Sequence, residues 1–277
     1  MTSYNRERYI SNAIESVLAS TYTNFELIIV DDVSIDKTFE IESSYAKNDS
    51  RIRLYRNEKN LGDYPNRNKA ASYANGKFLM YVDSDDMVLQ DGIENCLRAI
   101  SIFPDANFCM YSVSAAKEPF KLNTANALRE HFFKKPFLMI GPGGTVTRRT
   151  YFEKIKGYPE KYGPANDMYF NLKATCLSPI VMLPFDFMYY RRHEGQEINN
   201  AYSYLIYNYN YLKDALAELP MGLNKKEIDW LSKKNKRRFF VNIIRYFLKT
   251  GNISETRNAI KACSFKLHDS LEAVFQL

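Results

Sequence analysis

Apolar positions in the first third of the chain alternate between helical and strand-like spacing. Residues 6–20 place their apolar side chains on one stripe, which predicts an amphipathic helix with Asn5 as its N-cap. Short apolar runs predict three strands, at residues 25–30, 51–56 and 76–82. Helices are expected between them, one capped by Asp36 and running to about residue 47, and one over residues 63–74 after a turn at residues 57–62. Strands and helices that alternate at this spacing predict βαβ units, and therefore an α/β fold with a mostly parallel central sheet.

The later pattern mixes helices and strands at first and is entirely helical from residue 203 onward. We expect a helix over residues 89–102, strands over 107–113, 145–147, 180–183 and 187–191, and short helices over 151–155 and 165–174. Residues 117–136 are polar and give no clear prediction. From residue 203 onward the spacing predicts helices over 203–218, 225–249 and 254–273. These patterns predict an α/β domain over residues 1–195 and a C-terminal helical extension over residues 196–277.

Acidic residues follow two of the predicted strands. Asp31 and Asp32 end the first, and the run Asp83-Ser84-Asp85-Asp86 ends the third. The carboxyl ends of parallel strands share one edge of a sheet, where open α/β folds bind their ligands. Crowded carboxylates need a cation or hydrogen-bond donors, and a divalent ion that carries substrate phosphates suits them. The alternative is an Asp-rich turn that caps the next helix.

Composition excludes several classes of protein. With 45% hydrophobic and 25% charged residues, the chain resembles an ordinary globular protein. Its four cysteines are isolated, which argues against a zinc site or a disulfide framework and favours a reducing compartment. No apolar run approaches the length of a membrane span, and no signal-peptide pattern is present. We therefore expect a cytoplasmic protein, and no nucleic-acid partner.

Basic residues gather late in the chain, within a net charge of +6. The helix expected over residues 225–249 is both basic and strongly apolar. It could pack on the rest of the protein with a solvated basic face, or lie at the inner face of an anionic membrane. Packing is the favoured interpretation, and peripheral membrane contact is the alternative.

Several motifs in order resemble the family-2 glycosyltransferases of the GT-A fold. They are Thr2-Ser3-Tyr4-Asn5, Phe25-Glu26-Leu27-Ile28-Ile29-Val30-Asp31-Asp32, Asn60-Leu61-Gly62, Arg67-Asn68 and Asp83-Ser84-Asp85-Asp86. The resemblance covers roughly residues 1–195. It implies a Rossmann-like sheet flanked by helices, and an inverting transferase assisted by Mn²⁺ or Mg²⁺. Such an enzyme moves a sugar from a nucleoside-diphosphate donor, here expected to be a UDP-sugar, to a hydroxyl of a saccharide or a lipid-linked saccharide.

The resemblance also implies roles for individual residues. Thr2, Tyr4, Asp31, Asp32 and Arg67 match positions around the nucleotide. Asp83 and Asp85 form the D-x-D motif with Ser84 between them, and Asp85 matches the metal contact. The pair Asn166-Asp167 matches a Glu-Asp pair that supplies the general base, so Asp167 is the expected base although Asn replaces Glu. His193 matches a histidine that approaches the metal or the diphosphate. As alternatives, Asp167 would be a first-turn helix acid and His193 a packed or surface histidine.

One departure concerns the first strand. The family normally has about five apolar residues before Thr-Ser-Tyr-Asn in a central strand, and here only Met1 precedes Thr2. Without that strand its neighbours would keep unpaired backbone edges. A chain extended upstream by about ten native residues is therefore expected to melt at a higher temperature and to bind nucleotides more tightly.

Three other functions remain open from the sequence. A nucleotidyltransferase that makes activated sugars would share the layout, but it would need a Gly-rich phosphate loop that Thr2-Ser3-Tyr4-Asn5 does not provide. A non-catalytic remnant that binds nucleotide sugars fits the missing strand. A phosphohydrolase with an Asp nucleophile would leave Asp31-Asp32 and residues 60–68 unexplained. A glycosyltransferase for a bacterial surface polysaccharide or glycolipid is the leading hypothesis.

Overall fold

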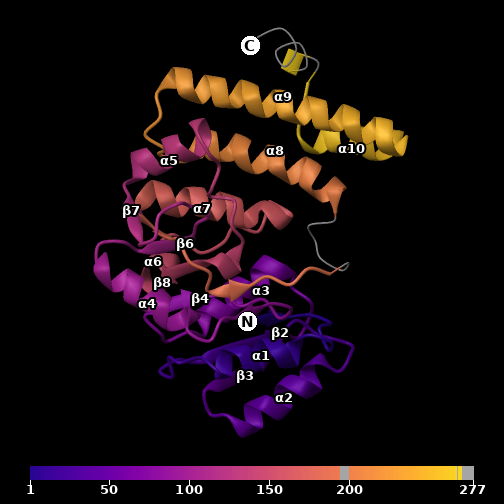
Figure 1. Cartoon of the computed structure of the whole chain (residues 1–277). Coiled ribbons are helices and arrows are strands. Elements are labelled where there is room, and N and C mark those ends of the chain that lie inside the picture. Colours follow the sequence, from indigo (N-terminus) through magenta and orange to yellow (C-terminus); the bar gives the residue numbers. More distant parts are fainter. Residues whose placement is uncertain (194–199, 267, 270–277) are drawn as a thin grey trace. The chain divides into compact units, whose positions relative to one another are not determined.

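The computed structural model describes residues 1–193, 200–266 and 268–269, which form two compact units (Figure 1). The first unit consists of Met1–Asn123, Met139–Tyr158 and Ser178–Arg192. The second consists of Thr124–Leu138, Pro159–Leu177 and His193–Leu277. The α/β class expected from the sequence is confirmed. Two internal segments group with the C-terminal helices, and the domain border expected at residue 195 stays a prediction.

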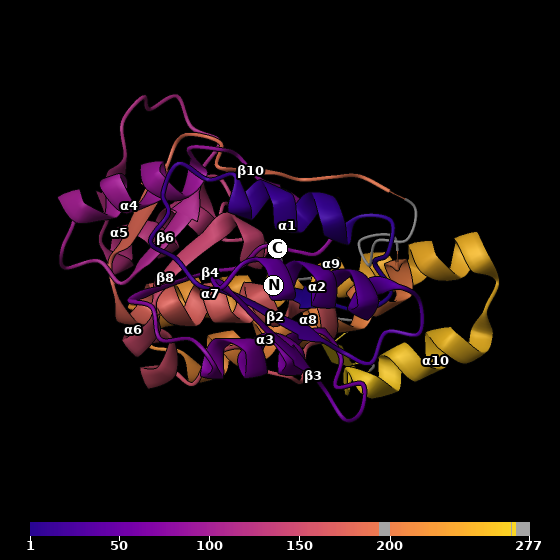
Figure 2. The same ribbon diagram turned by 90° about the horizontal axis from the view of Figure 1, so that it is seen from below.

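A parallel sheet opens the first unit. Its strands are β1 (Thr2–Ser3), β2 (Leu27–Asp31) and β3 (Ile52–Arg56), in the order β1-β2-β3. A parallel bridge from Thr2 to Asp83 continues the sheet beyond β1. Figure 2 shows α1 (Ile10–Leu18) and α2 (Thr38–Asn48) on one side of these strands and α3 (Asp63–Ser72) on the other. The strands are therefore covered on both faces.

The apolar run of β2 explains this two-sided burial. Successive side chains of a strand point to opposite faces, so a strand between two helical layers is apolar throughout. Leu27 and Ile29 pack in the cluster that holds the buried stripe of α1. Ile28 and Val30 pack with Ala70 of α3 on the opposite face. The predicted stripe of the first helix is confirmed, since Ile10, Ala13, Ile14 and Val17 are buried.

A mixed sheet completes the first unit. Its strands run in the order β4 (Phe78–Met80), β8 (Thr145–Arg148), β6 (Phe108–Tyr111), β9 (Ile180–Leu183) and β7 (Phe120–Leu122). β6 and β9 are parallel, and the other three pairs are antiparallel. A short antiparallel pair joins β5 (Met87–Val88) to β10 (Met188–Tyr189). α4 (Gly92–Ile102) packs Cys96, Ala99 and Ile100 into the core of this sheet.

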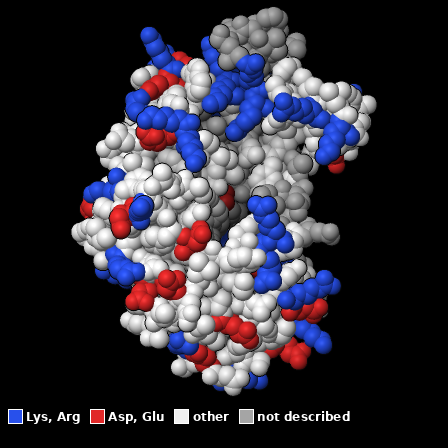
Figure 3. All heavy atoms as spheres, in the orientation of Figure 1, with Lys and Arg blue, Asp and Glu red and all other residues white. Residues whose placement is uncertain are grey.

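The second unit is helical. It contains α5 (Thr124–Phe133), α7 (Asn166–Leu177), α8 (Ala201–Glu218), α9 (Lys225–Thr250) and α10 (Ile253–Ala262). Phe239 and Ile243 of α9 are buried in a cluster with Leu205 and Tyr209 of α8. α9 therefore packs through its apolar side, while lysine and arginine side chains gather over it on the face seen in Figure 3. Within the described residues, no helix combines the length and apolar character needed to span a bilayer.

Three local expectations differ from the structure. Asn5 does not cap the first helix, because its φ is 52° and its Oδ1 accepts a hydrogen bond from Ile35 N instead. Residues 117–136 contain β7 and α5, which the polar composition did not predict. The helix expected over residues 254–273 ends at Ala262, and Ser264 has a left-handed φ of 50°. Part of that expected helix, residues 267 and 270–273, lies outside the described residues.

Candidate donor site

The two acid runs lie at the same edge of the sheet. β1 pairs in parallel with β2, which places Ser3 opposite Asp31. Thr2 pairs in parallel with Val30 on one side and Asp83 on the other. The carboxyl ends of β1, β2 and the segment after β4 therefore meet, as the sequence predicted.

Arginine side chains balance the acids after β4. Arg67 of α3 is buried, and its Nη1 lies 2.6 Å from Asp83 Oδ1. Arg6 Nε lies 3.0 Å from Asp85 Oδ2. Burial lowers the pKa of the Arg67 guanidinium, but the carboxylates of Asp63 and Asp83 outweigh burial and raise it well above its ordinary value. Arg67 is therefore a fixed positive charge beside the D-x-D motif.

Asp86 differs from its two neighbours because it is turned inward. It is 4% exposed, and its Oδ1 accepts a hydrogen bond of 2.9 Å from the backbone N–H of Arg191. Burial raises the pKa of its carboxyl to about 7, and the negative charges of Asp83 and Asp85 raise it further. The hydrogen bond from Arg191 acts in the opposite direction and lowers this pKa. Arg191 Nε also donates to the backbone oxygen of Asp85 at 2.9 Å. Asp86 thus connects the turn Asp83–Asp86, called the acidic turn below, to the segment that follows β10.

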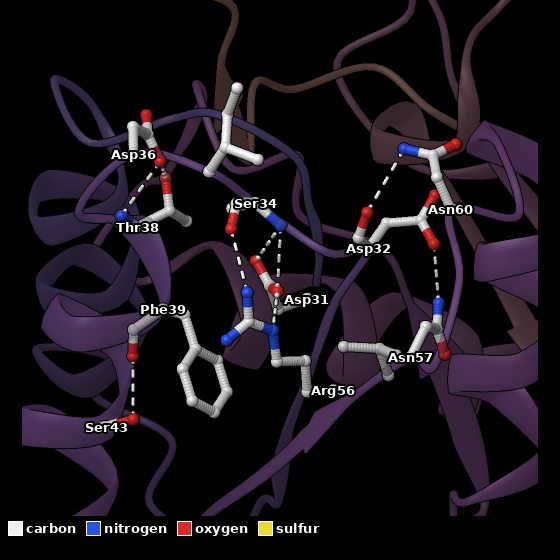
Figure 4. A network of polar contacts seen from close by, with 12 residues as sticks. Asp31, Asp32, Ser34, Asp36, Thr38, Phe39, Ser43, Arg56, Asn57 and Asn60 are labelled. Atoms are coloured by element: carbon white, nitrogen blue, oxygen red, sulfur yellow. Dashed lines mark hydrogen bonds and ion pairs between the residues drawn. The ribbon is translucent and has the colours of Figure 1, made fainter.

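Asp32 organises the neighbouring loop (Figure 4). Its Oδ1 accepts hydrogen bonds from Asn57 Nδ2 at 2.7 Å and Leu61 N at 2.9 Å, and its Oδ2 accepts one from Gly62 N at 2.9 Å. Gly62 has a φ of 84°, a conformation that glycine adopts without strain. The motif Asn60-Leu61-Gly62 is therefore wrapped around the Asp32 carboxylate.

Asp31 is enclosed more completely. It has no exposed surface, its Oδ2 lies 3.2 Å from Arg56 Nε, and it accepts a hydrogen bond from Ser34 N at 3.1 Å. The Arg56 guanidinium also lies 4.5 Å from the centre of the Phe39 ring (Figure 4). Asp31 thus supports the loop after β2 from below, and the direct nucleotide contact expected for it stays a prediction.

The remaining predicted residues fall into two groups. Thr2 is buried beside the acidic turn and Ser84 is buried within it, whereas Tyr4 is 45% exposed. Asp167 lies in the first turn of α7, in the second unit, and its Oδ1 accepts a hydrogen bond of 2.6 Å from Met168 N. His193 belongs to the second unit as well. The roles expected for Asp167 and His193 stay predictions.

The D-x-D acids have the chemistry of a site for a hard cation. Carboxylate oxygens are the ligands that Mg²⁺ and Mn²⁺ prefer. Among the described residues, no group of three or more His, Cys, Asp or Glu side chains is arranged to hold a metal ion. A site for Mg²⁺ needs only one or two protein carboxylates when substrate phosphates supply further oxygens. Asp83 and Asp85 therefore fit a metal ion that binds together with a diphosphate.

Three site residues could not be identified from the sequence. The motifs do not include Arg6, Asp63 or Arg191, and Arg191 is only the last residue of the strand expected over residues 187–191. Arg6 and Arg191 are 79 and 106 positions from Asp85 in the chain. The only signal for Asp63 was its spacing of four residues from Arg67 on the expected helix, which matches the ion pair of 2.8 Å between them.

Glu42 of α2 gives a first testable prediction close to β1. Its side chain is fully buried, and burial raises the pKa of its carboxyl to about 8. The Ser3 hydroxyl and the Met1 amine oppose this rise in the pKa, whereas the charges of Asp31 and Asp36 add to it. Because this pKa is raised on folding, its contribution to stability is complete below the ordinary value of 4.5 and is lost as the pH rises toward 8. Glu42→Gln should therefore increase the free energy of unfolding at pH 8 by about 3 kcal/mol, and the melting temperature should rise with it.

The control for this prediction is Glu40→Gln, an exposed carboxylate of the same helix. Thermal unfolding of both variants and the unchanged chain is followed at pH 5 and pH 8. The advantage of Glu42→Gln should shrink at pH 5, and Glu40→Gln should have little effect at either pH. An equal advantage at both pH values would show that Glu42 does not titrate in this range.

Comparison with curated proteins finds bacterial glycosyltransferases. Glycosyltransferase GlyA of Streptococcus pneumoniae is 28% identical over 210 residues, which cover 69% of this chain and 30% of GlyA. UDP-Glc:alpha-D-GlcNAc-diphosphoundecaprenol beta-1,3-glucosyltransferase WfgD of Escherichia coli is 44% identical over 95 residues, which cover 34% of this chain and 36% of WfgD. The chain thus spans about a third of the length of these relatives.

Comparison with solved structures identifies the fold. TarS from S. aureus in complex with UDP-GlcNAc matches with a TM-score of 0.75 at 23% identity, over 99% of this chain and 80% of the other. The mannosyltransferase PcManGT from Pyrobaculum calidifontis, in complex with GDP-Man and Mn²⁺, matches with a TM-score of 0.67 at 13% identity, over 98% and 76% of the two chains. The GT-A fold expected from the motifs is confirmed.

Family membership follows from a match over more than half of the chain. The profile of glycosyl transferase family 2 matches residues 1–156. This range contains β1, the loop around Asp32, Arg67 and the acidic turn after β4. The chain belongs to glycosyl transferase family 2.

Proposed function

We propose that this protein is an inverting, metal-assisted glycosyltransferase that moves a sugar from a UDP-sugar to an acceptor hydroxyl. The observation that carries the proposal is the acidic turn Asp83–Asp86, held by Arg6 and Arg67 at the carboxyl edge of the sheet. Membership of glycosyl transferase family 2 supports the same reaction. A UDP donor is favoured because TarS, a neighbour in fold, is solved with UDP and with UDP-GlcNAc.

The diphosphate end of the donor is assigned to Asp83, Ser84 and Asp85. Asp85 and Asp83 would hold Mn²⁺ or Mg²⁺, with His193 contributing from the segment after β10. Bound there, the ion would supply Lewis-acid neutralisation of charge on the leaving diphosphate. Arg67 keeps its positive charge next to Asp83, which favours the approach of an anionic donor.

The nucleoside end is assigned to the neighbouring loops. Thr2 and Tyr4 border the base, and Asp32 borders the ribose with the turn Asn60-Leu61-Gly62 that it fixes. Asp31 supports the loop after β2 indirectly, because it forms an ion pair with Arg56 and accepts a hydrogen bond from the backbone N–H of Ser34. A ligand bond to Asp31 itself would require these partners to move.

Asp167 is assigned the role of general base. Inversion at the anomeric carbon needs a carboxylate that takes the acceptor proton on the face opposite the leaving group. Asp167 is 9% exposed, and the hydrogen bond from Met168 N fixes the orientation of its carboxylate. A position in the first turn of α7 also stabilises its charged form.

The acceptor is proposed to be a saccharide or lipid-linked saccharide of a bacterial surface polysaccharide or glycolipid. WfgD, a relative in part of the chain, is named as a transferase for a diphosphoundecaprenol acceptor. A cytoplasmic location would give access to nucleotide sugars, and the basic side of α9 would allow contact with the inner membrane face.

A thermal-shift panel tests donor recognition. UDP-, GDP- and dTDP-sugars are added to the full chain with and without Mn²⁺, and the melting temperature is recorded. Because a ligand that binds only the folded state raises apparent stability, a donor at one hundred times its Kd should add about 2.7 kcal/mol. We expect a UDP-sugar to give the largest rise, and only with Mn²⁺. No rise with any nucleotide sugar would contradict the proposed donor class.

A further inference from the structure

An apolar groove lies between α9 and α10, within the second unit. Its volume is about 360 Å³. Small-molecule sites in proteins typically measure about 300–1,000 Å³. Ile243, Ile244 and Phe247 line the groove from α9, where this spacing places side chains on one face of a helix. Thr256 and Ile260 line it from α10. The groove therefore has two helical walls made almost entirely of apolar side chains.

The apolar surface continues beyond the groove to the turn that joins the two helices. Leu248 is 76% exposed and Ile253 is 56% exposed, on either side of Gly251, the C-cap of α9. Ile244 and Phe247, which line the groove, are exposed as well. Neighbouring apolar side chains in contact with water mark surfaces where a protein or a membrane binds. The end of α9 and the start of α10 therefore form an interaction surface.

Positive charge dominates this part of the second unit. Residues 230–266 contain ten Lys or Arg residues and one acid, Glu255, which accepts a hydrogen bond from the Tyr246 hydroxyl. Figure 3 shows lysine and arginine side chains gathered over α9. Five exposed cations on α9, α10 and the residues that follow have no acidic partner among the described residues, namely Arg245, Lys249, Arg257, Lys261 and Lys266. The apolar surface is therefore accompanied by positive charge that the described part of the chain does not neutralise.

The start of α9 differs because its exposed aromatic side chain already has partners. Trp230 packs on Phe133 of α5, with 5.5 Å between the ring centroids. The Lys234 ammonium lies 4.6 Å from the centre of the Trp230 ring. Phe247 lies about 25 Å away at the other end of the same helix, since each helical residue adds about 1.5 Å. The two ends of α9 can therefore be probed separately.

We propose that the groove between α9 and α10 binds a hydrocarbon chain of an anionic phospholipid in a bilayer, with Lys261 and Lys266 on the lipid phosphate. Lys266 lines the groove, and Lys261 directly follows Ile260 of its wall. A phospholipid presents an apolar chain next to an anionic phosphate, which matches an apolar groove with lysines beside it. Phenylalanine and leucine combined with lysine and arginine are typical of helices that lie in the membrane interface.

Charge and apolar burial both favour a lipid surface as the occupant. Each lysine or arginine near an anionic membrane strengthens binding. The methylenes of its side chain cover apolar surface while its charge reaches the headgroups. Leu248 and Ile253 enter the hydrocarbon beside the groove. The membrane contact proposed for α9 is thereby assigned to one end of the helix and to apolar insertion, and it does not depend on the proposed glycosyl transfer.

Tryptophan fluorescence tests where the lipid chain binds. Trp230 is the single tryptophan of the chain, and the variant Trp230→Phe/Phe247→Trp moves this probe to the groove. The variant and the unchanged chain are mixed with vesicles of phosphatidylglycerol and phosphatidylcholine with brominated chains, because bromine quenches tryptophan only on close contact. We expect strong quenching at position 247 and little at Trp230. Vesicles of brominated phosphatidylcholine alone should quench neither.

Three results of this experiment would overturn the proposal. Equal quenching at both positions would show that α9 lies on the membrane through its whole basic side. Absence of quenching at both positions would exclude a lipid chain from the groove, and a dimer on gel filtration would then assign the groove to a second copy. Quenching at position 247 that is as strong with phosphatidylcholine alone would exclude the phosphate contact of the lysines.

Vesicle sedimentation tests the lysines beside the groove with a matched pair of variants. Lys261→Gln/Lys266→Gln removes two lysines beside the groove, and Lys225→Gln/Lys226→Gln removes two exposed lysines at the start of α9. The first variant should weaken binding to phosphatidylglycerol vesicles by about thirtyfold, and the second by less than about threefold. Equal weakening would contradict a defined lipid site.

Leu248→Ser tests apolar insertion without disturbing the fold, because this side chain mainly contacts solvent. It should weaken sedimentation by about tenfold, since a leucine loses its burial in hydrocarbon. Ile102→Ser, at an exposed apolar residue that ends α4, is the control and should have no effect. Release of UDP from a UDP-sugar should be unchanged in both variants, so loss of lipid binding is distinguishable from failure of the proposed reaction. Unchanged sedimentation of Leu248→Ser would overturn the proposal.

Discussion

Replacement of Asp85 by asparagine is expected to reduce Mn²⁺-dependent turnover of a UDP-sugar by about a hundredfold to a thousandfold. Asp85 lies in the turn after β4 with its side chain 13% exposed, and Arg6 is its ion-pair partner. An amide of the same shape keeps the packing but removes the negative charge that a divalent cation needs. The loss should appear in kcat, because the ion stabilises charge that develops on the leaving diphosphate.

The matched control is Asp91→Asn, an exposed acid at the start of α4. It should retain turnover within about twofold, since surface substitutions away from a site rarely have larger effects. Melting temperatures of both variants show whether the fold is intact. If Asp85→Asn remained folded and lost less than about tenfold in turnover, Asp85 would not be a metal ligand in the reaction.

Replacement of Asp167 by asparagine is expected to reduce transfer by about a hundredfold to ten-thousandfold, while binding of the donor is unchanged. Asparagine retains an oxygen that can accept the hydrogen bond from Met168 N, so the first turn of α7 should keep its conformation. It cannot take a proton from an acceptor hydroxyl. Pre-steady-state transfer measured together with donor titration separates the two effects.

Asp229→Asn is the control for Asp167, because Asp229 is an exposed acid near the start of a helix in the same unit. It should change neither transfer nor donor binding. If Asp167→Asn bound the donor normally and transferred at the rate of the unchanged chain, the base would have to be a different residue. If binding and melting temperature fell together, Asp167 would act in the fold of α7.

The sequence predicted the N-terminal sheet well because its strands and helices obey simple periodicities. β2 is a continuous apolar run, and the helix that covers it shows a clear stripe, so both were predicted. The meeting of Asp31-Asp32 with the run Asp83–Asp86 also followed from a general property of parallel sheets. α5 was missed because only Ala127, Leu128 and His131 of it are buried, which leaves too short a stripe to recognise.

The electrostatic partners of the site could not be predicted in the same way. Arg6, Arg67 and Arg191 reach the acidic turn from three separate segments of the chain, and only the fold brings them within hydrogen-bonding distance. The hydrogen bonds of Asp31 and Asp32 within the protein could not be predicted either. The sequence pattern of an acid at a strand end is the same whether that acid supports a loop or contacts a ligand. Periodicity predicts elements, whereas these contacts depend on register and on loop conformation.

The most direct test of the proposed reaction is the release of UDP from UDP-sugars by the full chain, measured with Mn²⁺ and with EDTA. We expect at least one UDP-sugar to be consumed with Mn²⁺, and EDTA to slow its consumption by about a hundredfold or more. A chain that binds UDP-sugars but never releases UDP, with or without saccharide acceptors, would contradict the account and would be a binding protein rather than an enzyme.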